Sequence, residues 1–341
     1  MVERELQMKK RRFTTVVFTL LVLVMALTGC KKKSVEPHSI RIAIQPSAAF
    51  IPLYVARYSG VIEAALAPKK ISVIWQDFES GPPMIESLSA DLTDIAVIGD
   101  VPTVLALAGS TRMKLVGIPA SGPNAYAMIA RKDNDSFNSC ADIKGKRIAT
   151  VFGSTGHNFT KKLLEKSGLS FSDIEFTNIS AGTVEDVLSS GYADAVVIWE
   201  PNITRLVDKG GAKIVAQGDE TSLRGTNGFV VREEFLVKDK EAISIVLESF
   251  ARAAKSLNSL NVETTSNLAS ALNVTPEQVK KIARKYNYTV DIADDDVASL
   301  NDTIKFLVSI GNLENEYSVE KFVDKSCFSG SKVNHRSLGS Q

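Results

Sequence analysis

The sequence predicts an α/β protein with two lobes, each a mainly parallel sheet flanked by helices. Short aliphatic and β-branched runs alternate with helical patterns, and this order is typical of βαβ units. The pattern begins again at Arg147, after a first series of such units. A chain of 341 residues is too long for one small core and suits two lobes of ordinary domain size.

The first series contains three short apolar runs that are expected to form strands, at Ile40–Ile44, Ile71–Trp75 and Ile95–Ile98. A helical pattern follows each strand, so helices are expected at Pro52–Gly60, at Pro82–Ala90 and from about Thr103.

The second series opens with a strand at Arg147–Val151 and continues to Val230. From about Glu241 onward the chain becomes helical, with further helices expected near Thr275–Tyr286 and Asp294–Ile310. We expect these C-terminal helices to cover the lobes and brace the hinge between them.

An internal repeat at an offset of one hundred residues supports two similar lobes. Glu86–Ser89 and Asp94–Ile98 recur as Asp186–Ser189 and Asp194–Ile198, each copy being a helix, a tight turn and a buried strand. Helix–turn–strand units share composition, so chance is the alternative explanation. Ligands of open α/β sheets sit beyond the carboxyl ends of the strands. Two such ends facing each other would form a cleft between the lobes.

The N-terminal segment predicts export. Four cations at Lys9–Arg12 precede the apolar run Phe13–Leu27, which is short for a bilayer span and is followed by small residues. Leu27–Cys30 resembles the lipobox of bacterial lipoproteins, so Cys30 is expected to carry lipid and to be the first mature residue. An uncleaved membrane anchor is the alternative, and Met8 is a second candidate start.

These observations give a predicted organisation of the chain. We expect a signal peptide at 1–29, a tether at 30–39, lobe 1 at 40–122 and 228–328, lobe 2 at 123–227, and a disordered tail at 329–341.

Composition and motifs exclude several classes of function. The formal net charge is +1, so the basic excess that nucleic-acid binding needs is missing. The three histidines are scattered and no Cys/His spacing resembles a metal site, so neither metal nor other cofactor is expected. The sequence contains no strong catalytic signature. Cys140 and Cys327 would meet oxidising conditions outside the cytoplasm, but spacing alone does not decide whether they pair.

Several short stretches together resemble the aliphatic-sulfonate, taurine and nitrate branch of ABC-importer binding proteins. They are Gly60–Glu63, Ser80–Pro83, Ile98–Pro102, Asp142–Ala149, Gly153–His157 and Val197–Pro201. The resemblance covers roughly residues 40–315. It implies a type II periplasmic-binding-protein-like fold, with two lobes that are joined by crossover strands and close on a ligand. One departure is Glu200, where the family more often shows Asp after the Trp.

The first candidate contact lies at a predicted helix start. Ser154, Thr155 and Gly156 follow a strand and open a helix, whose free N–H groups and partial positive charge favour an anion. The alternative for either hydroxyl is a plain N-cap, which is compatible with anion contact. His157 lies in the first turn and is included, although a surface position is the more usual role for such a residue.

Other candidates follow the remaining strands. Ser80 and Gly81 begin a second helix, where capping and ligand contact are equal alternatives. Gly99 and Asp100 follow the strand of the first repeat; Asp100 either caps the helix beginning near Pro102 or holds a cationic or hydrogen-bonding group of the ligand.

The last candidates are Gln45 and Ser47 after the first strand and Trp199 and Glu200 after the strand of the second repeat. Gln45 is expected to be a neutral polar contact or a buried structural residue, and Trp199 an apolar wall. Two carboxylates near one pocket would favour a ligand with an amine or several donors.

We therefore expect an extracytoplasmic solute-binding component of an ABC importer and not an enzyme. Its ligand would be an aliphatic sulfonate or taurine, with nitrate or a pyrimidine or thiamine precursor as alternatives. The expected partners are this ligand, the permease and the membrane through a lipid anchor, with no nucleic acid, and the protein is expected to be a monomer.

Such a protein would lie at the outer face of the cytoplasmic membrane or in the periplasm. An enzyme of the menaquinone-pathway dehydratase type is a further alternative, disfavoured by the export signal. An extracytoplasmic sensor domain is disfavoured because no second apolar span follows.

Overall fold

The computed structural model describes residues 38–328 of the chain. The predicted signal peptide, the lipidated Cys30, most of the predicted tether and the predicted C-terminal tail lie outside these residues. Ser39, the last residue of the predicted tether, already begins strand β1.

The first sheet has five strands in the order β2-β1-β3-β11-β4. They are β2 (Ser72–Asp77), β1 (Ser39–Ile44), β3 (Ile95–Gly99), β11 (Asn227–Arg232) and β4 (Met113–Gly117). Strand β11 is antiparallel to its two neighbours, and the other four strands run in one direction. We call the residues around this sheet lobe 1.

The second sheet repeats that plan in the order β10-β6-β9-β7-β8. Its strands are β10 (Ala212–Gln217), β6 (Tyr126–Arg131), β9 (Ala195–Trp199), β7 (Arg147–Thr150) and β8 (Glu175–Asn178). Only β6 runs against the rest. Each sheet therefore has one antiparallel strand, which is the first strand after the chain crosses from the other sheet. The predicted mainly parallel sheets are confirmed, and the residues around this sheet are called lobe 2.

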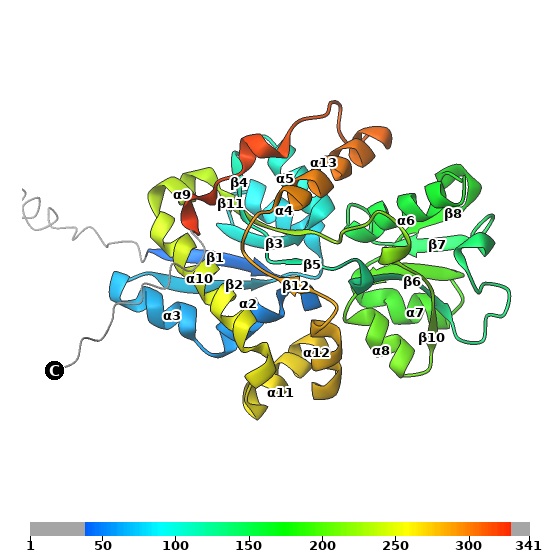
Figure 1. Ribbon diagram of the computed structural model, residues 1–341, viewed down its shortest axis with the longest axis horizontal. Helices are drawn as coiled ribbons and strands as arrows, with labels where there is room; N and C mark the ends of the chain where they lie inside the picture. The colour runs from blue at the N-terminus through cyan, green and yellow to red at the C-terminus, as the bar shows by residue number, and fades with distance from the viewer. Residues whose placement is uncertain (1–37, 329–341) are drawn as a thin grey trace, which may run out of the picture. The chain divides into compact units, whose positions relative to one another are not determined.

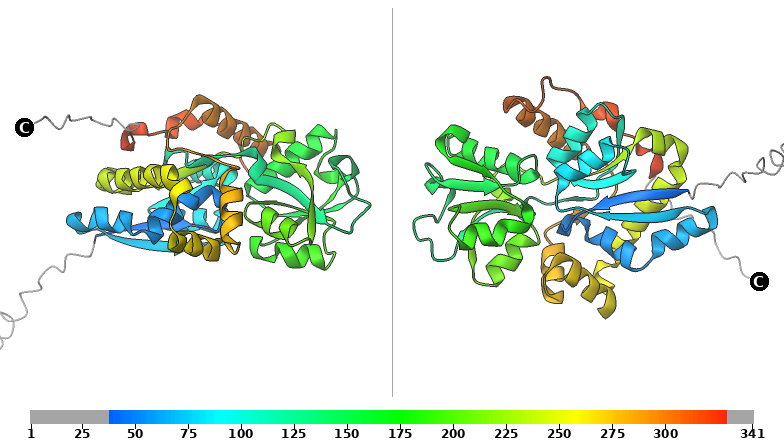
Figure 2. Two further views of the ribbon diagram at one scale, coloured as in Figure 1. Left: turned by 60° about the horizontal axis from the view of Figure 1, so that its bottom comes forward. Right: turned by 180° about the vertical axis from the view of Figure 1, so that it is seen from behind.

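Helices flank both sheets (Figure 1). They are α2 (Ile51–Tyr58), α3 (Val61–Leu66), α4 (Gly81–Ser89), α5 (Asp100–Ala108), α6 (Thr155–Lys166), α7 (Val184–Ser189), α8 (Asn202–Asp208), α9 (Glu233–Lys238), α10 (Lys240–Ser256), α11 (Val262–Leu272), α12 (Pro276–Ala283) and α13 (Asp294–Ser309). The C-terminal helices return to lobe 1, where α10 packs on α2 and α3, and α13 packs on α5. In Figure 2 the green elements of lobe 2, including α6, α7 and α8, gather together on one side of the blue and cyan elements.

Helix α5 begins three residues before the expected start at Thr103. Gly99 occupies the N-cap position with extended backbone, and Asp100 is already helical. Pro102 therefore lies in the first turn, where its missing N–H leaves no intrahelical bond unmade.

The two copies of the internal repeat make matching hydrogen bonds between an aspartate and an arginine. In lobe 1 the Asp94 carboxylate accepts hydrogen bonds from the backbone N–H and the guanidinium of Arg41. In lobe 2 Asp194 accepts the corresponding bonds from Arg147. Each pair ties the start of a central strand to the neighbouring strand.

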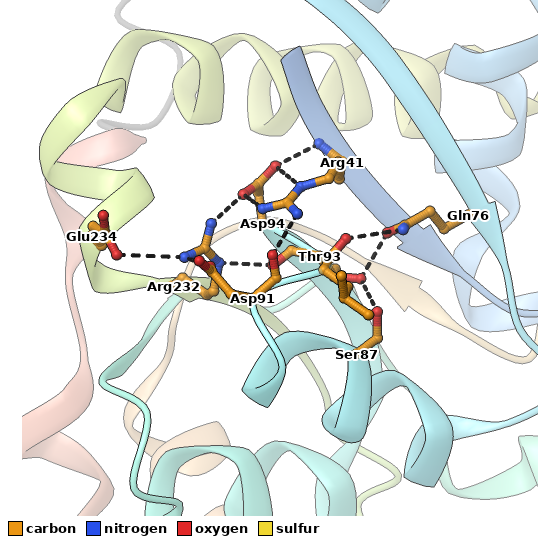
Figure 3. Close-up of polar contacts among 9 residues, drawn as sticks. Arg41, Gln76, Ser87, Asp91, Thr93, Asp94, Arg232 and Glu234 are labelled. Carbon is orange, nitrogen blue, oxygen red and sulfur yellow. Dashed lines mark hydrogen bonds and ion pairs between the residues drawn. The ribbon is translucent and has the colours of Figure 1, made fainter. Parts of the chain in front are cut away.

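Lobe 1 adds a second arginine to its pair. Arg232, at the end of β11, donates to Asp94 at 2.5 Å and also pairs with Asp91 (Figure 3). The side chains of Arg232 and Asp94 are 8% and 2% exposed, so this is a buried ion cluster. It joins β1, β3 and β11.

Two crossovers and a C-terminal segment connect the lobes. The first crossover contains β5 (Ala120–Ser121), which pairs with β12 (Asn287–Tyr288) of the C-terminal segment. Gly122 lies so close to this segment that a Cβ would stand 2.2 Å from the Lys285 carbonyl oxygen. Glycine is therefore required where the connecting backbones touch.

The two cysteines in the described part of the chain are free and buried. Cys140 lies in lobe 2 and Cys327 in the C-terminal segment that returns to lobe 1, so the disulfide left open by the sequence is not formed. Within residues 38–328 no single helix has the length and apolar composition needed to cross a membrane; only the bent pair Ala48–Tyr58 and Val61–Lys69 meets that test by length and composition.

Candidate functional site

A small cavity lies between the two lobes and has a volume of about 20 Å³. It is lined by Gln45, Ser47, Gly81, Gly99, Pro102, Tyr126, Ser154, Thr155, Trp199 and Asn227. Seven of the twelve predicted ligand-binding residues are in this set, and their contact with a ligand remains a prediction. Gly99 and Trp199 are the last residues of the two repeated strands, so the cavity lies at the carboxyl ends that the repeat indicated.

Three α-helices begin at this cavity. Gly81 is the first residue of α4, Gly99 is the N-cap of α5, and Ser154 and Thr155 are the N-cap and first residue of α6. The first N–H groups of a helix lack intrahelical partners and carry a partial positive charge. Two such starts from lobe 1 and one from lobe 2 therefore make the cavity attractive to an anion.

Ser154 has the capping role that the sequence left open. Its hydroxyl accepts a hydrogen bond from the Gly156 N–H at 3.1 Å and donates one to the Val151 carbonyl oxygen at 2.6 Å. Ser80 occupies the N-cap position of α4 without a side-chain cap bond. Ser80 is buried beside the cavity but is not among its lining residues.

The two lobes approach closely at this point. A Cβ on Gly99 would lie 2.5 Å from Thr155 Oγ1, which belongs to the other lobe. With a volume of about 20 Å³ the cavity holds about one water molecule. An organic ligand needs several hundred Å³, so its entry requires the lobes to separate.

Gln45 supplies a polar group that has no internal partner. Its side chain is 6% exposed, and Oε1 makes no hydrogen bond within the described residues. A buried acceptor without a donor is costly. The Gln45 amide at the end of β1 is therefore suited to contact a ligand or an ordered water.

Asp100, for which the sequence left helix capping and ligand contact as alternatives, is not among the residues that line the cavity. It accepts hydrogen bonds from the Val101 N–H at 2.8 Å, from Asn158 Nδ2 at 2.9 Å and from Thr303 Oγ1 at 3.2 Å. Burial raises the pKa of the Asp100 carboxyl, and hydrogen bonds from these groups and from Thr155 oppose the rise. The Asp100 carboxyl is therefore held by α6 and α13, and it also contacts the side chain of Thr155, which lines the cavity.

Glu200 is likewise absent from the lining of the cavity. It is fully buried and accepts hydrogen bonds from the N–H and the hydroxyl of Thr204, in the first turn of α8, at 3.0 and 2.7 Å. It also forms an ion pair with Lys285. Glu200 thus stabilises the start of α8. Both carboxylates directly follow a lining residue of the cavity, but neither is itself among the lining residues, and a contact of either with a ligand stays a prediction.

His157 and Gly156 also lie outside the lining, and the usual surface position of such a histidine does not apply here. The His157 ring is buried, and burial lowers its pKa to about 4. It packs against four aromatic rings, those of Phe152, Phe171, Phe176 and Phe306. A Cβ on Gly156 would lie 2.5 Å from Thr150 Oγ1, so this glycine lets α6 pack closely on β7.

Sequence reasoning missed three lining residues, Pro102, Tyr126 and Asn227. Tyr126 and Asn227 are the first residues of the two antiparallel strands β6 and β11. An antiparallel strand begins at the edge where its parallel neighbours end. Both residues are polar and stand at the start of the first strand after a crossover between the lobes. That position is the sequence signal that could have identified them.

Within residues 38–328 no group of three or more His, Cys, Asp or Glu side chains is placed to hold a metal ion.

Residues 84–258, just over half of the chain, match the family model described as NMT1/THI5 like. The chain belongs to the NMT1/THI5-like family. A protein of Bacillus subtilis (strain 168) named "Putative aliphatic sulfonates-binding protein" is 27% identical over 329 residues, which are 94% of this chain and 98% of that protein.

Solved structures resemble this member of the family along most of its length. The alkanesulfonate-binding protein SsuA from Xanthomonas axonopodis pv. citri, bound to MOPS, has a TM-score of 0.77 and 24% identity, over 85% of this chain and 99% of that one. The desulfurization enzyme DSZB has a TM-score of 0.63 and 16% identity, over 85% and 97%. The fold is periplasmic-binding-protein-like, as the sequence predicted.

Proposed function

We propose that this chain is the solute-binding component of an ABC importer and that it binds a small organic monoanion, an aliphatic sulfonate, between its lobes. One observation carries the proposal: three helix starts from two lobes converge on one cavity. No Lys or Arg is among the cavity's lining residues in the described part of the chain. The charge of the ligand would be balanced by N–H groups and hydroxyls, an arrangement suited to a single negative charge.

The rest of the lining supports an organic group attached to that charge. Tyr126, Trp199 and Pro102 offer aromatic and aliphatic surface for an alkyl chain. The name of the Bacillus subtilis relative agrees with this choice of ligand.

Taurine is a less suitable ligand than an unsubstituted sulfonate. Its ammonium group needs a carboxylate or several acceptors when it is removed from water. The two carboxylates that could have served, Asp100 and Glu200, are both bound to internal partners. We therefore expect ethanesulfonate to bind more tightly than taurine.

A thermal-shift screen followed by calorimetry tests the proposed ligand. Ethanesulfonate, taurine, nitrate, sulfate and a pyrimidine would be compared, because a ligand of the folded state raises the melting temperature by mass action. The expected order places ethanesulfonate first. Stabilisation by the pyrimidine or nitrate alone would contradict the proposal.

The chemistry of the lining also argues for binding without reaction. Among the described residues that line the cavity, none is Cys, His, Lys, Asp or Glu, so the hydroxyls of Ser47 and Ser154 have no adjacent general base there. The carboxyl beside Thr155, that of Asp100, already accepts hydrogen bonds from Val101, Asn158 and Thr303. Mass spectrometry of the ligand recovered after long incubation should show it unchanged. Conversion of the ligand would favour an enzyme of the kind that shares this fold.

Export and anchoring complete the proposal. The N-terminal cations, the apolar run and Leu27–Cys30 support a lipid anchor at Cys30, which would hold the protein beside its permease at the outer face of the cytoplasmic membrane or in the periplasm.

A further inference from the structure

The Asp100 carboxyl is a buried acidic group directly behind the wall of the cavity between the lobes. Asp100 is 1% exposed, and both Gly99 before it and Pro102 two residues later line the cavity. Thr155 of lobe 2, a third lining residue, hydrogen-bonds to the same carboxyl. An anion that contacts the Thr155 hydroxyl would therefore have the Asp100 carboxyl on the other side of that hydroxyl.

The contacts of Asp100 favour its ionised form. Oδ1 accepts from the Val101 N–H at 2.8 Å, and Oδ2 accepts from Asn158 Nδ2 at 2.9 Å. N–H groups can only donate, so each carboxyl oxygen serves as an acceptor, and hydrogen bonds of this kind stabilise a carboxylate. Burial opposes ionisation and raises the pKa of the Asp100 carboxyl, so its charge is best examined at alkaline pH.

No cation neutralises this charge within residues 38–328. The hydrogen bonds to Asp100 come from neutral groups, and Asp100 forms no ion pair there. Its counterpart in the second repeat, Glu200, is also buried but is paired with Lys285. Of the two carboxylates that follow the repeated strands, Asp100 is thus the one whose negative charge acts unopposed on an anion in the cavity.

We propose that Asp100 determines the charge selectivity of the cavity, because its carboxylate repels a dianion more strongly than a monoanion. This inference rests on the proposed function, since it concerns the same anion site. The three helix starts can compensate one negative charge of a ligand. The repulsion by Asp100 is proportional to the ligand's charge and is weakly screened in a buried site. Asp100 therefore lets an alkylsulfonate bind and disfavours free sulfate.

Calorimetric titration of the full-length protein with ethanesulfonate and with sulfate tests this role, at pH 8 and constant ionic strength. Both ligands are tetrahedral at sulfur, and sulfate carries one more negative charge. The natural protein should bind ethanesulfonate at least about tenfold more tightly than sulfate. Asp100→Asn removes the charge at nearly constant shape and should reduce this ratio of affinities by about tenfold. A defect in packing or in closure of the lobes weakens both ligands alike, so the ratio reports the charge.

Two further variants support the measurement. Asp186→Asn removes an exposed carboxylate from α7 and should leave the ratio unchanged. Asp100→Ser also lacks the charge, and it should reduce the ratio even if the asparagine variant does not fold.

Two results would overturn the role of Asp100 and leave the proposed function intact. One is an unchanged ratio in the folded Asp100 variants, and the other is equal affinity of the natural protein for the two anions. Failure of ethanesulfonate to bind the natural protein would instead reject the proposed function, and this inference with it.

Discussion

Glu79 and Gly182 join the two lobes through a hydrogen bond: Glu79 Oε1 accepts from the Gly182 N–H at 2.8 Å. The same oxygen accepts from the Ser180 hydroxyl. Glu79 precedes α4 in lobe 1, whereas Ser180 and Gly182 lie in the turn that leads into α7 of lobe 2. A carboxylate of one lobe thus binds an N–H group and a hydroxyl near a helix start of the other lobe, which is a favourable position for negative charge.

This bond predicts that Glu79→Gln weakens ligand binding without touching the cavity. The bond exists only when the lobes are together, so its loss disfavours the arrangement that encloses a ligand. The groups are exposed, so we expect about a three- to tenfold loss of ethanesulfonate affinity. Calorimetry measures the change, with Glu86→Gln on the exposed face of α4 as the control. Equal affinity of the two variants for ethanesulfonate would show that the Glu79 bond does not stabilise the arrangement that encloses a ligand.

The repeated Arg–Asp pairs predict unequal losses of stability. Asp94→Asn removes the buried carboxylate that Arg232 shares with Arg41, leaves Arg232 only the exposed Asp91 and Glu234, and should cost about 3 kcal/mol of the free energy of unfolding. Asp194→Asn removes the partner of Arg147, whose side chain is 44% exposed, and should cost about 1 kcal/mol or less. Urea denaturation of both variants gives the comparison. Equal losses would mean that the buried position of Arg232 has no energetic consequence.

His157 predicts a loss of stability at mildly acidic pH. Burial lowers its pKa to about 4 in the folded protein, whereas the unfolded value is about 6.5. Between these values the unfolded chain binds a proton that the folded protein does not. The contribution of His157 to the free energy of unfolding should therefore be fully present above pH 6.5. As the pH decreases from 6.5 toward 4, the free energy of unfolding should fall by up to about 1.4 kcal/mol per pH unit because of this group.

The variant His157→Phe isolates this effect, since a phenyl ring suits the surrounding aromatic side chains and does not titrate. Denaturation curves at pH 7.5, 5.5 and 4.5 should show a smaller loss in the variant than in the natural protein. Identical pH profiles would contradict a buried neutral histidine.

Thr155 predicts a measurable contribution to the affinity for a sulfonate. Thr155→Ala removes a hydroxyl from the cavity while the N–H groups of α6 remain. The expected loss is about 1.5–3 kcal/mol, or one to two decades in affinity. Thr155→Ser keeps the hydroxyl and should retain most of the affinity. Equal binding by the alanine variant and the natural protein would show that the Thr155 hydroxyl does not contact the ligand and serves only its hydrogen bond to Asp100.

Cys30 predicts lipid attachment. Metabolic labelling with palmitate should mark the natural protein, and Cys30→Ala should be unlabelled and either unprocessed or released from the membrane. Label that persists on the variant would refute the lipobox interpretation.

Much of the architecture was predictable because its signals are local. Ile40–Ile44 and Ile95–Ile98 are apolar runs of strand length, and the structure contains them as β1 and β3. The repeat of Asp94–Ile98 in Asp194–Ile198 also located the cavity, because a strand's carboxyl end follows directly from where its apolar run stops. The repeat therefore identifies Gly99 and Trp199 as candidates, and the apolar run Arg147–Val151 identifies Thr155 in the same way.

The sequence by itself determined the α/β class, the two repeated sheets and the edge at which the cavity lies, since each depends on neighbouring residues. Only the tertiary structure decided where the polar side chains at that edge point. Asp100 turns toward Asn158 and Thr303, and Glu200 toward Thr204 and Lys285, and three of these four partners lie far away in the sequence. A buried carboxylate takes the direction in which its hydrogen bonds can be completed, and no local pattern records where those partners come to lie.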